Sequence, residues 1–69
     1  MIRPVAVLAR LDDDGGYEVI LVDADHRGFI FLVTRTRQYA NYVCVALAWN
    51  QRVCAQPARP PVQAATGSP

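Results

Sequence analysis

The chain has 69 residues, of which 52% are hydrophobic and 19% are charged, and its net charge is +1. This length allows one domain, and the hydrophobic content is enough for a core, which excludes a wholly disordered chain. The near-zero charge lacks the basic excess that is typical of a dedicated nucleic-acid-binding protein.

The first half of the chain contains three segments with the alternation and the β-branched residues of strands. They are residues 3–11, 17–24 and 29–36. The dipeptide Asp14-Gly15 is a strong signal for a two-residue hairpin turn, and residues 25–28 have the composition of a second tight turn. The sequence therefore predicts a three-stranded antiparallel meander.

Residues 38–54 fit either a helix or a further strand. As a helix the segment gives one apolar face, interrupted by Asn50; the face consists of Tyr39, Tyr42, Val43, Ala46, Leu47, Val53 and Cys54. Its length, its alanines and the lack of an internal turn signal favour the helix, with Thr36 as the N-cap. The predicted fold class is α+β, a three-stranded antiparallel β-meander with one packed C-terminal helix, and the alternative is a small all-β barrel.

The composition changes after residue 55. Prolines at 57, 60, 61 and 69 and several alanines follow, and such a segment cannot pack a core. We therefore expect a small α+β domain over residues 1–55 and a disordered Pro/Ala-rich tail over residues 56–69.

The two cysteines point to a reducing compartment. In a helix Cys44 and Cys54 would lie about 15 Å apart along the axis, which is too far for a disulfide. Two free, buried thiols are typical of the cytoplasm, here of a bacterium or a phage-infected host. The sequence has no secretory signal pattern and no apolar run of membrane-spanning length, so we expect a cytoplasmic protein without a membrane partner.

A two-residue turn at Asp14-Gly15 would pair Ala9 with Ile20 and Val7 with Val22, and this register fixes the two faces of the sheet. The predicted core face is Val5, Val7, Ala9, Leu11, Ile20, Val22, Ala24, Phe29, Phe31 and Val33. The predicted outer face is Ala6, Leu8, Tyr17, Val19, Leu21, Ile30 and Leu32, with Arg10, Asp23, Thr34 and Thr36 around them. Glu18 is expected to pair with Arg35.

One helix covers only one face of a sheet, so the outer face would remain an exposed apolar patch, and such patches mark interaction sites. The predicted partner-binding residues are Leu8, Arg10, Tyr17, Val19, Leu21, Ile30, Leu32 and Trp49. The expected partner is another protein or a second copy of the chain. The alternative is a nucleic acid bound by Arg35, Arg37 and Arg52.

No residue pattern in the sequence indicates a catalytic or metal-binding site. Asp12 begins an acidic run, but the sixth position of a calcium loop would be Tyr17 rather than glycine. His26 has no nucleophile to form a triad, and with two nearby aspartates it is a weak metal signal. We expect no catalytic residue, metal or cofactor.

The type of chain suggests a function class. Very short, lysine-free chains without catalytic motifs are common among phage-encoded inhibitors of host machinery such as RNA polymerase or CRISPR complexes. This comparison rests on type rather than on any residue. The expected function is a small non-enzymatic, protein-binding regulator or inhibitor, with a nucleic-acid-binding regulator as the alternative.

Overall fold

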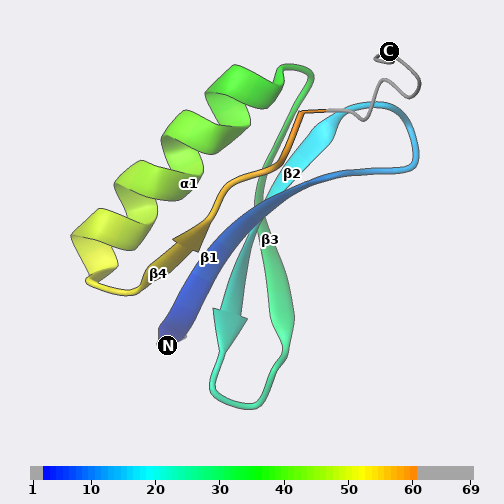
Figure 1. The fold of residues 1–69 in the computed structure, drawn as a ribbon. Helices are drawn as coiled ribbons and strands as arrows, with labels where there is room; N and C mark the ends of the chain where they lie inside the picture. The colour runs from blue at the N-terminus through cyan, green and yellow to red at the C-terminus, as the bar shows by residue number, and fades with distance from the viewer. Residues whose placement is uncertain (1–2, 61–69) are drawn as a thin grey trace, which may run out of the picture.

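The computed structural model describes residues 3–60, which form an α+β fold (Figure 1). The elements are β1 (Pro4–Leu11), β2 (Tyr17–Asp23), β3 (Gly28–Thr34), α1 (Arg37–Gln51) and β4 (Cys54–Gln56). The sheet is open, with strand order β3-β2-β1-β4. The first three strands are an antiparallel meander, and β4 runs parallel to β1. The predicted meander and helix are confirmed, and the alternative of an all-β barrel is wrong.

The helix begins and ends at recognisable caps. Thr36 is extended, with a φ of −111°, and its side chain accepts a hydrogen bond from the Tyr39 N–H at 3.3 Å, as predicted for an N-cap. At the other end Arg52 is left-handed, with a φ of 59°, and Val53 N–H donates to Ala48 O at 2.9 Å. This closure is typical of a helix C-terminus and turns the chain into β4, so the helix stops short of the predicted residue 54.

Small side chains bring α1 close to the sheet. Ala40, Cys44 and Ala48 are buried at four-residue spacing, and the Cys44 thiol donates to Val7 O at 3.3 Å. Val43 and Leu47 flank this row and are partly buried against the core. Of the predicted apolar face, Val43, Leu47 and Val53 pack against the core. The rest of that face is exposed, because the helix lies on the sheet through the row of small residues; the exposed members are Tyr39, Tyr42, Ala46 and Cys54.

The β1–β2 hairpin turns through residues 12–16 rather than through a two-residue turn. The Asp12 carboxylate organises this loop: the N–H groups of Asp14 and Gly16 donate to its Oδ1 at 2.8 and 3.0 Å. Gly15 takes the left-handed conformation that ends the turn, with a φ of 86°. An aspartate that bonds the backbone ahead of it in this way stabilises a longer, bulged hairpin loop.

The β2–β3 hairpin has the same kind of loop, in which one aspartate carboxylate accepts hydrogen bonds from two backbone N–H groups. The N–H groups of Asp25 and Arg27 donate to Asp23 Oδ1 at 2.9 and 3.0 Å. His26 occupies the left-handed position that Gly15 occupies in the first loop, with a φ of 65°. In both hairpins, aspartates at the first and third loop positions precede the left-handed residue.

The longer first loop shifts the register by one residue from the prediction. Ala9 lies opposite Val19, and Val7 lies opposite Leu21. Because side chains alternate between faces, this shift moves the whole of β2 to the other face relative to β1. The core under the helix is built from Val7, Ala9, Tyr17, Val19, Ala40, Cys44 and Ala48, with Leu21 and Leu32 packed against it.

A bulge in β3 changes the face assignment a second time. Val19 pairs with Leu32 but Ile20 pairs with Ile30, so Phe31 is the extra residue on β3. Phe31 is 53% exposed and not in the core. Of the predicted core face, Val7 and Ala9 do lie in the core. Its other large members on β1 and β3 are exposed, and the prediction is wrong for them; they are Val5, Leu11, Phe29, Phe31 and Val33. Ile20 is buried on the side of the sheet away from the helix.

The described chain beyond β4 stays attached to the domain. The Asn41 side chain makes two hydrogen bonds to the backbone of Ala58. Its Nδ2 donates to Ala58 O at 3.0 Å, and its Oδ1 accepts from Ala58 N–H at 2.7 Å. Ala58 packs against the core. The ordered part thus continues past the expected boundary at residue 55, and of the expected tail, residues 61–69 lie outside the described residues.

The face assignment can be tested with two substitutions. Val19→Ala removes a fully buried side chain and should cost about 2 kcal/mol of unfolding free energy. Phe31→Ala should cost less than about 1 kcal/mol, because much of the ring is already in water. Urea denaturation of both variants measures the two costs, and a larger loss for Phe31→Ala would contradict the register.

The contact between Asn41 and Ala58 gives a second prediction. Asn41→Ala leaves a backbone N–H and C=O without their partner and should lower the unfolding free energy by about 1–3 kcal/mol. Asn50→Ala, at an exposed position of the same helix, is the control and should change it by less than about 0.5 kcal/mol. Equal thermal melts for both variants would show that Ala58 does not dock.

Candidate docking surface

The outer side of α1 carries large apolar side chains. Tyr42, Val45 and Trp49 are 70%, 42% and 82% exposed. Their spacing of three and four residues places them on one stripe, on the side of the helix away from Ala40, Cys44 and Ala48. We call Tyr42, Val45 and Trp49 the outer helix stripe. The helix is thus apolar towards the sheet and also towards water.

No charged residue lies between Arg37 and Arg52, so the outer helix stripe is uncharged over its whole length. Arg37 stands in the first turn of α1, and Arg52 is the exposed residue that ends the helix. The outer helix stripe therefore presents an uncharged, largely aromatic surface, and an arginine stands at each end of the helix that carries it.

Strand β3 carries a second set of exposed apolar side chains, next to the exposed turn of the β2–β3 hairpin. This turn lies beyond the end of the helix in Figure 1, and residues 24–31 are all exposed. Ile30, Phe31 and Val33 are 61%, 53% and 56% exposed. A shallow hollow on the open face of the sheet lies between Leu8, Ile20 and Ile30.

The predicted partner-binding residues do not share one face. Leu8, Arg10 and Ile30 lie on the side of the sheet without the helix. Tyr17 and Val19 are buried, and Leu21 and Leu32 pack against the core. Trp49 stands on the outer helix stripe. The prediction of one continuous patch is wrong, because it depended on the register that the Asp12 loop shifts.

The sequence pattern did not predict the exposure of Tyr42, Val45, Phe31 and Val33. The signal for the helix was present in the pattern, because a helix with apolar residues all round must be covered on more than one side. The signal for β3 was absent, because a bulge is not readable from the alternation of residues.

The three arginines of the alternative nucleic-acid site do not form one patch. Arg35 and Arg37 stand at the start of α1, and Arg52 stands at its end. A helix of 15 residues is about 22 Å long, so these charges lie at opposite ends of the element. The geometry gives two separate cationic points instead of a groove.

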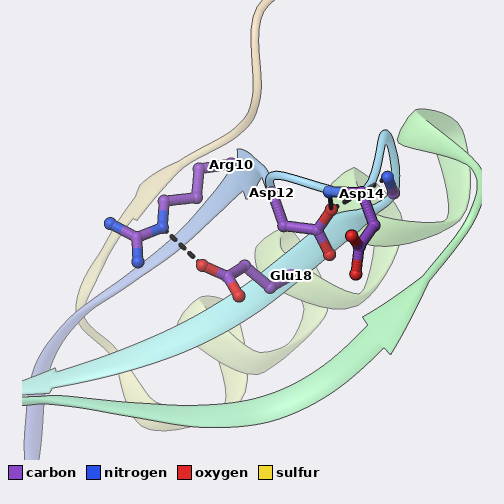
Figure 2. Close-up of polar contacts among 5 residues, drawn as sticks. Arg10, Asp12, Asp14 and Glu18 are labelled. Carbon is purple, nitrogen blue, oxygen red and sulfur yellow. Dashed lines mark hydrogen bonds and ion pairs between the residues drawn. The ribbon is translucent and has the colours of Figure 1, made fainter.

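Figure 2 shows the polar contacts at the first hairpin. Arg10 Nε donates to Glu18 Oε2 at 2.6 Å, and the two residues lie opposite each other on β1 and β2. The Glu18 side chain is only 11% exposed, so this ion pair supplies the partner that a buried carboxylate needs. The predicted pair of Glu18 with Arg35 is wrong, because Val33 rather than Arg35 lies opposite Glu18 on β3.

Among residues 3–60 no group of three or more His, Cys, Asp or Glu side chains is placed to hold a metal ion. Within the same range, no helix has the length and apolar character needed to cross a membrane.

The two cysteines have different surroundings. Both are free, as predicted; Cys44 is buried, whereas Cys54 is exposed, contrary to the prediction. Burial raises the pKa of the Cys44 thiol, which keeps it protonated and unreactive at neutral pH.

Thiol labelling tests this difference. At pH 7.5 one equivalent of a thiol reagent should react with the folded protein at Cys54, and a second only after denaturation. Cys54→Ser should leave the folded protein unreactive. Rapid labelling of Cys44 in that variant would contradict the packing of α1 on the sheet.

Comparison of the chain with protein-family models, with curated proteins and with solved structures finds no match.

Proposed function

We propose that this protein is a small non-enzymatic regulator or inhibitor that docks on another protein through the outer helix stripe. The exposure of Trp49, at 82%, is the observation that supports this most strongly. Tryptophan and tyrosine are the residues most enriched among those that dominate binding energy, and leaving them in water forgoes the burial of a large apolar area.

The chemistry of the stripe defines the partner. The site on the partner is an apolar groove that receives Trp49 and Tyr42, bordered by carboxylates that face Arg37 and Arg52. Charge at the two ends directs the approach and fixes the orientation of the helix, while the aromatic centre supplies the affinity. This is helix-in-groove recognition.

A phage-encoded inhibitor of a host complex, such as RNA polymerase or a CRISPR complex, is the finer form of this proposal. The small size of the chain and the lack of a catalytic pattern support it by type. The outer helix stripe is compatible with occlusion of a groove on such a complex.

The fluorescence of Trp49 can report binding of the partner, because Trp49 is the only tryptophan in the chain. The free protein should show the red-shifted emission of an indole in water and should be quenched readily by iodide. Binding of the partner should shift the emission to the blue and protect it from iodide.

A photo-crosslinking experiment identifies the partner by position. A photoreactive phenylalanine analogue in place of Trp49 or Tyr42 should form one shared adduct in lysate of cells that express the gene. The same analogue at the neighbouring Gln51, also exposed, is the control. The candidate is then purified and its affinity measured.

Trp49→Ala should weaken binding of that purified partner by at least about thirtyfold, as expected for a central aromatic anchor, whereas Asn50→Ala should change it little. Raising the salt from 50 to 500 mM should lower the affinity by less than about tenfold, since the interface is mainly apolar. Equal affinities for the two variants would contradict the proposal. A steep loss with salt and competition by DNA or RNA would favour the nucleic-acid alternative.

A further inference from the structure

The sheet ends at β3, and this edge has almost none of the usual protection against pairing. Among the described residues no strand pairs with the outer edge of β3. The strand, GFIFLVT, has seven residues without a charge or a proline. Soluble proteins usually shield such edges with charges, prolines, short strands or bulges. The bulge at Phe31 is the one such device here, and β3 continues to pair with β2 on both sides of it.

The side chains of this edge are apolar on both faces of the sheet. Ile30 and Val33 belong to the open face, Phe29 pairs with Leu21 on the helix side, and Phe31 stands at the bulge. All four are exposed, Phe29 at 37%. A strand added at this edge would therefore gain backbone hydrogen bonds and cover apolar side chains on both faces.

We propose that this edge binds β3 of a second copy, so that two chains form one antiparallel eight-stranded sheet around a twofold axis. A twofold axis brings the same surface of two chains together, which suits a strand that is apolar along its whole length. The axis stands perpendicular to the sheet, so both helices lie on the same side and both outer helix stripes stay uncovered.

Opposite charges flank the two ends of β3. Asp25 lies in the turn before the strand, and Arg35 follows its last residue. Antiparallel pairing of β3 with β3 of the second copy brings the turn that carries Asp25 near the end of the strand that carries Arg35. The side chains of Asp25 and Arg35 are exposed in the single chain, so both are available.

The size of the chain supports a second copy as the occupant. A domain this small buries too little surface for more than marginal stability, and such domains usually add disulfides, a metal or a partner subunit. Both cysteines are free, and residues 3–60 offer no metal-binding group. Pairing at β3 supplies the missing burial.

Sedimentation equilibrium of the full chain tests the proposal. The wild type should be a dimer at micromolar concentration, and Ile30→Lys should raise the dissociation constant by at least about thirtyfold while the chain remains folded by circular dichroism. Val45→Lys, the same kind of change on the outer helix stripe, is the control and should leave the dimer intact.

Charge reversal tests the antiparallel pairing independently of apolar burial. Asp25→Arg and Arg35→Asp should each weaken the dimer by about three- to tenfold, and the double variant should restore it. The restoration cannot come from a change in the stability of the single chain. A monomeric wild type at 100 µM, or a dimer that Val45→Lys disrupts and Ile30→Lys does not, would overturn the proposal.

Fluorescence of Trp49 can contradict the dimer proposal and the proposed function independently of each other. Dimer formation leaves Trp49 in water, so its emission should stay the same when the protein is diluted from dimer to monomer. A blue shift that accompanies self-association would assign the outer helix stripe to the second copy and contradict both proposals. A monomeric protein that still binds its partner through Trp49 would contradict the dimer alone.

Discussion

Two hydrogen bonds to one carboxylate determine the arrangement of the whole domain. Asp12 accepts from the N–H groups of Asp14 and Gly16 and thereby stabilises a loop over residues 12–16. The length of that loop sets the register of β1 against β2. Because side chains alternate along a strand, the register decides which half of the apolar residues faces the helix.

The packing of the helix follows from that register. Val7, Ala9 and Val19 form the core together with the small residues of α1. The row of alanine and cysteine fixes which side of the helix faces the sheet, and Tyr42 and Trp49 lie exposed on the opposite side. The strand order places β3 at the edge of the sheet.

The sequence allowed the element types, the antiparallel meander, the helix and its Thr36 cap to be predicted, because these depend on local signals. The faces could not be predicted. Asp14-Gly15 reads as a two-residue turn, and the competing bonds to Asp12 lie outside that dipeptide. The strand β4 has three residues and is held by β1 and by the contact of Asn41 with Ala58, both distant in sequence.

The positions of the exposed apolar residues depend on the register in the same way as the faces of the sheet. Leu8 and Ile30 lie on the open face of the sheet, and Trp49 is exposed, so these three residues are outside the core as predicted. Tyr17 and Val19 are buried, contrary to the prediction, since a shift of one residue exchanges buried and exposed positions in β2. Residue composition thus predicted that apolar surface remains exposed, whereas only the three-dimensional register located it.

Nuclear Overhauser contacts between β1 and β2 test the central claim most directly, because they report the register itself. The account predicts cross-strand contacts that pair Val7 with Leu21 and Ala9 with Val19. Contacts that instead pair Val7 with Val22 and Ala9 with Ile20 would show that the hairpin has a two-residue turn. They would also return Val19 and Leu21 to the outer face and contradict the account of both surfaces.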